Sequence, residues 1–342
     1  MSRQIRARVD RRRFIQGAST IAAASVIPGC GGEDVVERPA NVPVGPFGAK
    51  STAEAVTAGI DLSGRTALVT GANSGLGYET MRVLALRGAH VIGTGRTVEK
   101  AETACASVAG STTPVVLELS DLESCANCAQ EVAALDRPID FLICNAGIMA
   151  LPELEQVDGI ERQFFVNHLG HFAFATQLLD QVRAAEAGRI VILSSLGHKW
   201  APEAGIEFDN LSGERDYDPN KMYGQSKLAN GLFAFELARR LADSNATANA
   251  VHPGIINTNL GRHFPAWQRV AAGLIGWTFM KSIGEGAATQ CFVATDLTLA
   301  GVSGYYFADC NAEVPEAKMN DAALAARLWE VSEEITGVKT SI

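Results

Sequence analysis

The chain has 342 residues, of which 47% are hydrophobic, enough for one large α/β domain with appendages. Its formal net charge of −9 argues against a nucleic-acid partner. The charge is uneven, because residues 1–30 hold six arginines and one aspartate. A basic N-terminal segment on an otherwise acidic chain indicates a targeting segment.

The first thirty residues carry export signals. Arg11-Arg12-Arg13-Phe14-Ile15 fits the twin-arginine pattern, and the apolar run that follows is too short to predict a membrane span. Ile27-Pro28-Gly29-Cys30 resembles a bacterial lipobox, which would make Cys30 a lipid acceptor. We predict export by the twin-arginine route and a periplasmic, cell-envelope lipoprotein. The alternatives are an organellar transit peptide or an uncleaved basic arm on a cytoplasmic protein.

A stretch rich in Gly, Pro and Val follows, without the periodicity of a core-forming element. We expect a flexible tether over residues 31–55 and one domain over residues 56–342. Apolar runs then alternate with helical patterns, of which two are Tyr78–Arg87, ending at Gly88, and Leu122–Leu135. The expected strands are Thr66–Thr70, His90–Thr94, Pro114–Leu117, Ile139–Asn145, Arg189–Ser194, Thr247–Val251 and Gly304–Phe307.

This alternation predicts an α/β fold of the Rossmann type, a doubly wound parallel sheet in a single domain with helices on both faces. Several of the strands are continuous apolar runs, as expected where both faces of a sheet are covered. The ligand crevice should lie at the carboxyl ends of the strands.

A glycine-rich turn joins the first strand to the first helix. In Gly71-Ala72-Asn73-Ser74-Gly75-Leu76-Gly77, the glycines permit a tight turn and a helix N-terminus facing a pyrophosphate. The second strand ends near Arg96, where an NAD site would carry an acidic residue. Because Arg96 can pair with a 2′-phosphate, we predict NADP as the cofactor, with NAD and a merely solvated arginine as the alternatives.

Two further strand ends should border the cofactor. The third strand leads into Glu118-Leu119, whose acidic group can reach an adenine amino group. Asn145-Ala146-Gly147 ends the fourth strand, where a small, tight turn lets the backbone pass beside the cofactor.

Tyr223 and Lys227 are four residues apart and should share one helix face. A nearby ammonium favours the phenolate, so we expect Lys227 to lower the pKa of Tyr223. Such a pair suits proton transfer in carbonyl–alcohol chemistry. The alternative is a pair of exposed helix residues.

Cysteine and histidine patterns predict no metal site. Cys125 and Cys128 form a C-x-x-C inside a predicted helix, without a second pair, and are expected to be small buried residues. His168, His171 and His198 lack carboxylate-supported ligand spacing. We expect the first two to pack or to cap.

Together these motifs resemble the short-chain dehydrogenase/reductase family, over about Leu62 to Gly337. The matching residues are the glycine turn, Asn145-Ala146-Gly147, Asn167, Ser195, Tyr223 with Lys227, and His252-Pro253-Gly254. Asn167-His168-Leu169-Gly170-His171-Phe172 and the residues around Tyr223 are similar to the retinol dehydrogenase-like branch. Glu118 departs from the family, which usually has Asp there.

The resemblance implies NADP-dependent hydride transfer between a carbonyl and an alcohol, with Tyr223 as general acid or base. Lys227 would lower the tyrosine pKa and hold the nicotinamide ribose, and Ser195 would bind the substrate oxygen. Asn167 would hold a water for proton relay. Pro253, Gly254 and Thr258 would border the nicotinamide and the phosphates.

Two segments, His198–Met222 and His263–Ile283, should flank the mouth of the site. The second is rich in apolar residues, which favours a lipophilic substrate, although buried core or a dimer contact gives the same composition.

The resemblance implies a dimer or tetramer, whereas an apolar lid is equally compatible with a membrane-associated monomer. A competing function is a non-catalytic NADP-binding or redox-sensing protein.

Overall fold

The computed structural model describes residues 37–256 and 280–340. The predicted export signal over residues 1–30 and the predicted cofactor contact Thr258 lie outside them. So does most of the expected second flanking segment, from His263 to Phe279.

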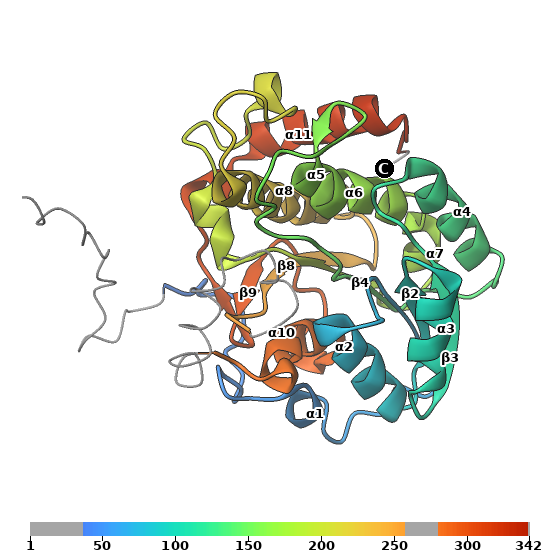
Figure 1. The fold of residues 1–342 in the computed structure, drawn as a ribbon. Helices are drawn as coiled ribbons and strands as arrows, with labels where there is room; N and C mark the ends of the chain where they lie inside the picture. The colour runs from blue at the N-terminus through green and yellow to red at the C-terminus, as the bar shows by residue number, and fades with distance from the viewer. Residues whose placement is uncertain (1–36, 257–279, 341–342) are drawn as a thin grey trace, which may run out of the picture. The chain divides into compact units, whose positions relative to one another are not determined.

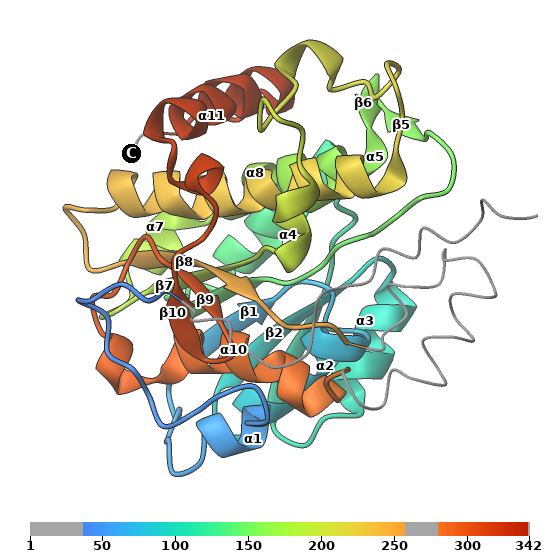
Figure 2. The same cartoon turned by 90° about the vertical axis from the view of Figure 1, so that its left-hand side faces the viewer.

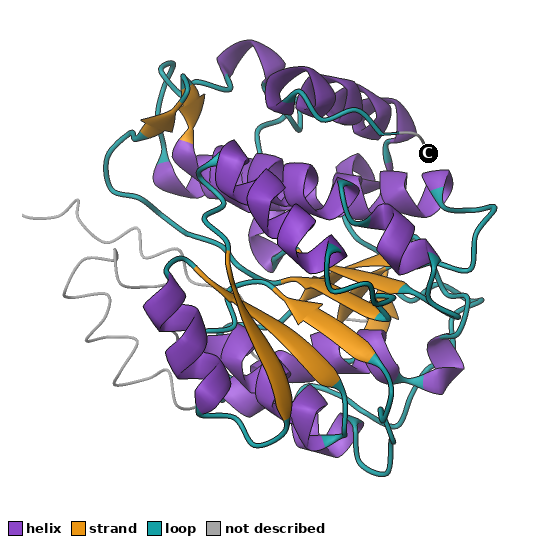
Figure 3. Cartoon of the chain, turned by 90° about the vertical axis from the view of Figure 1, so that its right-hand side faces the viewer, coloured by secondary structure: helices purple, strands orange, loops and turns teal. Residues whose placement is uncertain are grey.

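An eight-stranded sheet forms the middle layer of the fold (Figure 3). All neighbouring strands are parallel except the antiparallel pair β9 and β10. In sheet order the strands are β10 (Asn311–Glu313), β9 (Tyr306–Ala308), β8 (Thr247–His252), β7 (Arg189–Leu193), β4 (Phe141–Cys144), β1 (Thr66–Val69), β2 (His90–Gly95) and β3 (Ser111–Val116). The order reverses between β1 and β4, which confirms the predicted doubly wound sheet.

Helices cover both faces of the sheet (Figures 1 and 2). One layer contains α4 (Leu122–Ala133), α5 (Arg162–Phe164), α6 (Gly170–Thr176), α7 (Leu179–Arg183) and α8 (Pro219–Arg240), with α11 (Ala322–Thr336) outside α8. The other contains α1 (Ala53–Val56), α2 (Gly75–Leu86), α3 (Val98–Ala106) and α10 (Ile283–Thr295). A small antiparallel pair, β5 (Gln156–Val157) and β6 (Ile160–Glu161), precedes α5.

Sheet position explains where the strands depart from expectation. β3 begins at Ser111, ahead of the expected Pro114, and Pro114 pairs with Gly93 inside the ladder. Because β3 is an edge strand, a residue without a backbone N–H is tolerated there. β10 was not expected, since the turn before it uses Asp309 and Cys310, both at positive φ, in place of the usual Asn-Gly.

The expectation that His168 packs is confirmed. Its ring lies between aromatic side chains, with centroids 5.3 Å from Phe164 and 5.8 Å from Phe233. Its Nε2 is 2.8 Å from the hydroxyl of Ser332 on α11. Burial lowers the pKa of His168 to about 3, so the ring is neutral and helps to fix α11 on the layer of α8.

The expected tether over residues 31–55 is wrong from Glu37 onward. The Glu37 carbonyl accepts a hydrogen bond of 2.9 Å from the backbone N–H of Val314. The ring of Phe47 meets that of Phe292 edge to face, with centroids 5.8 Å apart. This stretch has no strand period, yet it packs on α10 and β10 because Val42 is buried and Phe47 is partly buried there, while Val44 stays exposed. The part of the tether before Glu37 lies outside the described residues.

The cysteine expectation holds in the structure. Cys125 and Cys128 are both fully buried on α4, and burial raises the pKa of Cys125 to about 12. Over residues 37–256 and 280–340, no group of His, Cys, Asp and Glu side chains could hold a metal ion. Within the same ranges, no helix combines the length and apolarity needed to cross a membrane.

Candidate active site

The site forms where the strand order reverses, between β1 and β4. The hydroxyl of Thr70, which follows β1, accepts the backbone N–H groups of Asn145 and Ala146 at 2.9 Å each. The Asn145 side chain donates to the Thr70 carbonyl at 2.9 Å. The structure thus brings the glycine turn and the Asn-Ala-Gly turn together at the carboxyl ends of two adjacent strands.

The glycine turn leaves no room for a side chain at Gly71 or Gly77. Gly71 has φ of 66°, and a Cβ on Gly77 would lie 2.3 Å from the Gly71 carbonyl oxygen. Ser74 precedes α2 without a side-chain capping bond, so its hydroxyl does not occupy the helix N-terminus. Gly75 and Leu76 open the helix itself. This backbone cradle fits the pyrophosphate of a dinucleotide.

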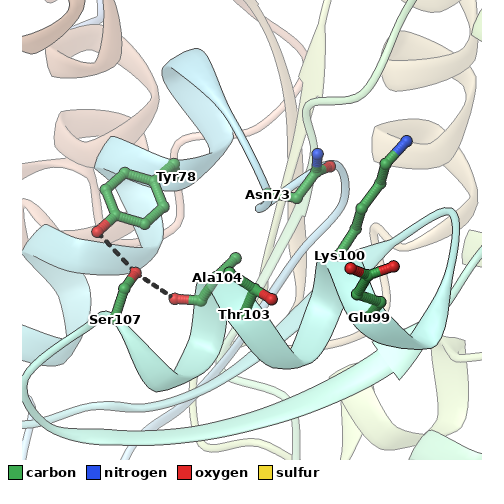
Figure 4. Close-up of a pocket in the computed structure, with 7 residues that line it drawn as sticks. All are labelled: Asn73, Tyr78, Glu99, Lys100, Thr103, Ala104 and Ser107. Carbon is green, nitrogen blue, oxygen red and sulfur yellow. Dashed lines mark hydrogen bonds between the residues drawn. The ribbon is translucent and has the colours of Figure 1, made fainter.

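A cavity of about 400 Å³ opens beside this turn, between α2 and α3 (Figure 4). Its lining residues are Asn73, Tyr78, Glu99, Lys100, Thr103, Ala104 and Ser107. The Tyr78 hydroxyl and Ser107 Oγ are 2.9 Å apart at one end, while Asn73 and Lys100 lie together at the other. Arg96 is exposed just before α3, on the loop that ends β2. The cavity does not reach the predicted catalytic residues.

Glu118 and Leu119 differ in how they can meet a cofactor. The Glu118 carboxylate accepts both the backbone N–H and the hydroxyl of Ser120, at 3.0 and 2.7 Å. It is therefore turned back onto its own loop. The Leu119 side chain is buried in the core, which leaves only its backbone to face a ligand.

Tyr223 and Lys227 lie on α8, as predicted, and both are buried. The Lys227 ammonium donates to the Leu193 carbonyl at 3.1 Å and lies 5.7 Å from the centroid of the tyrosine ring. Glycines bring α8 close to the end of β7. A Cβ on Gly197 would lie 2.8 Å from the Tyr223 ring, and one on Gly224 would lie 2.6 Å from backbone of the same turn.

The prediction that the pKa of Tyr223 is lowered is wrong. Burial raises the pKa of Tyr223 to about 12, and a hydrogen bond with the Ser195 side chain only partly opposes that shift. Burial also lowers the pKa of Lys227 to about 8. The loss of water around the phenolate outweighs the ammonium, which donates to a carbonyl rather than to the phenol. Tyr223 is therefore protonated at neutral pH.

Ser195 lies immediately after β7 and caps the 3-10 helix η2 (Leu196–Trp200). Its Oγ accepts the Gly197 N–H at 3.0 Å and also bonds the Tyr223 side chain. The preceding Ser194 donates to the Lys227 carbonyl at 2.7 Å. The end of β7 is thus joined to α8 through both Ser194 and Ser195.

Asn167 lies in a π-helical turn, η1 (Phe165–Leu169), and its side chain is fully buried. Its Oδ1 accepts the Ile148 N–H at 2.8 Å, and its Nδ2 donates to the Ile148 carbonyl and to the Ser226 hydroxyl, both at 2.9 Å. The side chain therefore anchors the loop after β4. π-helical turns often accompany functional sites.

A buried histidine that motif reasoning treated only as packing or capping completes this region. The Thr70 hydroxyl already accepts two N–H groups, so its proton must point to His171 Nε2, 2.9 Å away. His171 Nδ1 then carries the ring proton and donates to the Asn167 carbonyl at 3.0 Å. The spacing of four residues between Asn167 and His171 is the sequence signal for this bond.

The remaining predicted contacts follow β8. Gly254 has φ of 94°, and a Cβ there would lie 2.6 Å from the Lys281 side chain, which pairs with Asp309. Pro253 precedes it on the same half-buried loop. On the other side of the site, a Cβ on Gly147 would lie 3.4 Å from the Lys227 ammonium. Among the described residues, contacts thus join the glycine turn, the Asn-Ala-Gly turn, Asn167, Ser195, Tyr223 and Lys227. The Glu118 carboxylate is instead turned back onto its own loop, Arg96 is exposed at the end of β2, and Gly254 packs on Lys281.

The chain is similar to known proteins over most of its length. The sequence profile of the family "short chain dehydrogenase" matches residues 65–269. Short-chain dehydrogenase TIC 32 B, chloroplastic, from Brassica napus is 41% identical over 298 residues, covering 84% of this chain and 93% of that protein. Retinol dehydrogenase 14 from Homo sapiens is 40% identical over 297 residues, covering 81% and 88%. A crystal structure of an uncharacterized protein from Mycobacterium Paratuberculosis is 34% identical, with a TM-score of 0.68, and covers 84% and 98%.

These similarities agree with the site geometry. The matched residues include the glycine turn, the Asn-Ala-Gly turn and the Tyr223–Lys227 pair. The expected family and its branch are confirmed. The chain belongs to the short-chain dehydrogenase/reductase family, in its retinol dehydrogenase-like branch, and is an NAD(P)-dependent oxidoreductase acting on alcohols and carbonyls.

Proposed function

We propose that the protein reduces a lipophilic aldehyde or ketone with NADPH, and that Tyr223 is the general acid. One observation carries this proposal. The phenol of Tyr223 bonds the Ser195 hydroxyl at the end of β7, and the Lys227 ammonium lies between the Leu193 carbonyl and the Asn-Ala-Gly turn. A pure binding protein has no need for this buried proton-transfer set.

The nicotinamide, when bound, supplies the hydride that reaches the carbonyl carbon of the substrate. Tyr223 donates its proton to the carbonyl oxygen, which becomes the alcohol, and is left as a phenolate. Because burial raises its pKa, Tyr223 holds this proton at neutral pH and is available as the general acid for reduction. Ser195 orients the oxygen, and the charge of Lys227 stabilises the phenolate.

The residues beside the glycine turn favour NADP over NAD. Arg96 is exposed at the end of β2, and Lys100 and Asn73 line one end of the adjoining cavity. Two cations and an amide suit a 2′-phosphate, while an NAD site would carry an acidic residue at the end of β2. Glu99 also lines this cavity, so the selectivity depends on the arginine and lysine outweighing it.

Three exposed apolar side chains on the loops that follow β7 and β8 favour a lipophilic substrate. Leu196 and Trp200 belong to the turn after Ser195, and Ile255 follows the loop after β8. The Trp200 ring is 6.3 Å from the Tyr223 ring, centroid to centroid. Exposed apolar groups gathered around a site indicate an apolar ligand.

The direct test is NADPH consumption by the purified protein against a panel of aldehydes and ketones of increasing hydrophobicity. We expect turnover that rises with chain length and is weaker with NADH. NADPH binding, followed by its fluorescence, is measured in parallel. Binding without turnover across the panel would reject the proposal and favour a non-catalytic redox sensor.

We also propose, on the sequence alone, that residues 1–30 direct export and that Cys30 receives a lipid. Support comes from the twin-arginine pattern and the lipobox-like stretch. Cell fractionation with and without globomycin tests this, with Cys30→Ser as the variant that should leave the membrane fraction. An unlipidated cytosolic protein with an intact N-terminus would contradict it.

A further inference from the structure

The turn that carries Ser195 is held by two histidines from different parts of the chain. His198 lies on the turn itself, and its Nδ1 is 2.6 Å from the Ser195 carbonyl oxygen. His252 ends β8, and its Nδ1 is 3.1 Å from the backbone nitrogen of Leu196. The two bonds therefore fix the peptide that joins Ser195 to Leu196 at both its oxygen and its nitrogen.

Proton counting assigns a different tautomer to each ring. A carbonyl oxygen only accepts, so His198 must carry its proton on Nδ1. A backbone N–H only donates, so Nδ1 of His252 must be bare and its proton must be on Nε2. Burial lowers the pKa of both rings, that of His252 to about 4, so both are neutral at neutral pH.

We propose that His198 and His252 are positioning residues that act as opposite neutral tautomers and set the direction of the Ser195 hydroxyl. The inference rests on the proposed role of Ser195 in binding the substrate oxygen. Ser195 Oγ accepts the Gly197 N–H, so rotation of the Ser195–Leu196 peptide would move the hydroxyl away from Tyr223.

Other contacts hold the turn around this peptide. Gly197 and His198 are buried, with Gly197 packed against the Tyr223 ring, whereas Leu196 is exposed. The Ser195 carbonyl also accepts the backbone N–H of His198 at 3.0 Å, while the Leu196 N–H has His252 as its partner. The backbone N–H of Ser194 is fixed to the Val251 carbonyl at 2.9 Å, which holds the strand but not the residue after it. His252 also precedes Pro253, so it links the cofactor loop to the substrate turn.

Nuclear magnetic resonance of the full protein labelled with ¹⁵N-histidine tests the tautomers without a substrate. We expect the Nδ1–H form for His198 and the Nε2–H form for His252 at pH 7, assigned by loss of each signal in the variants. His90, whose Nδ1 faces the Ser111 hydroxyl far from the site, serves as the assignment control. The reverse tautomer at either position would overturn the proposal.

Kinetics then separate positioning from simple stability. Because misplacing a reacting group by about 1 Å can cost about 10²-fold, His198→Ala and His252→Ala should lower kcat by about 10–100-fold. His198→Asn should restore most of the rate, since its amide can donate at the same place. His252→Asn should do the same through its amide oxygen. His90→Ala should leave kcat unchanged.

Two readouts keep the outcomes distinct. Tyr223→Phe that retains turnover would reject the proposed function itself. If Tyr223→Phe is inactive but both alanine variants turn over normally, only the positioning role fails. It also fails if NADPH affinity or the melting temperature falls in step with kcat, or if the asparagine variants rescue nothing.

Discussion

The two ends of the candidate active site, one for the substrate and one for the cofactor phosphate, are built differently. At the substrate end, Tyr223, Lys227 and Asn167 are buried, and each has a protein partner for its polar group. At the phosphate end, Arg96 and Ser74 are exposed, and the cavity beside them opens between α2 and α3.

The two ends therefore differ in how much of their geometry is set before a ligand binds. The substrate end is preorganised, so little rearrangement is needed when charge develops on the reacting oxygen. At the phosphate end only the shape of the backbone is set in advance, while its charged side chains can adjust to a ligand. Mutations should therefore impair chemistry at one end and cofactor affinity at the other.

Tyr223→Phe gives the most stringent test of this separation. Loss of a general acid costs about 10²–10⁴-fold, and we expect kcat to fall by that amount. NADPH binding, measured by fluorescence titration, should change less than about threefold. This limit corresponds to a change in binding free energy of only about 0.6 kcal/mol. A parallel loss of NADPH affinity would show that the two ends are not separable.

Arg96→Ala should produce the converse pattern. A hydrogen bond to a charged group contributes about 1.5–3 kcal/mol, so the KM for NADPH should rise about 10–100-fold. The KM for NADH and the kcat at saturating NADPH should stay near their wild-type values. Arg137→Ala, an exposed arginine after α4, is the matched control. Equal effects on both cofactors would refute the 2′-phosphate assignment.

The pH dependence of reduction should reflect the buried lysine. Its pKa is lowered to about 8, so Lys227 loses its charge as pH rises through 8, while Tyr223 keeps its proton to about pH 12. We expect kcat/KM for reduction to fall above pH 8, by up to about tenfold per pH unit. In Lys227→Arg the decrease in kcat/KM should be absent up to pH 10. A decrease that persists in this variant would show that another group titrates.

Tyr306→Phe should have the smallest effect. Among the described residues, the Tyr306 hydroxyl is buried without a hydrogen-bond partner, as is Nε2 of the neighbouring His198. Removing that hydroxyl should change the free energy of unfolding by less than about 1 kcal/mol and leave kcat unchanged. Tyr217→Phe, which loses a bond of 2.8 Å to the Leu151 carbonyl, should be destabilising in the same urea titration. A large decrease in kcat in Tyr306→Phe would show that Tyr306, on β9, also helps to position the reacting groups.

The fold could be predicted because it depends on local patterns, and so could the elements on which the candidate site residues lie. Apolar runs, glycine turns and the spacing from Tyr223 to Lys227 each have one structural solution within a doubly wound sheet. The direction of the tyrosine pKa could not be predicted, because it depends on burial by residues distant in sequence. The bonds from His171 to Thr70 and from His252 to Leu196 join residues 101 and 56 positions apart, which no local pattern records.

The packing of the chain from Glu37 onward limits how far an anchored enzyme can reach. Six residues lie between Cys30 and Glu37, so seven residue-to-residue steps join them (37 − 30 = 7). A fully extended chain spans at most about 3.6 Å per residue, so those residues cover about 25 Å. If Cys30 were acylated, the catalytic domain would be confined to a thin layer of water next to the bilayer. Molecules dissolved in that membrane would then meet it at a local concentration far above their concentration in bulk water.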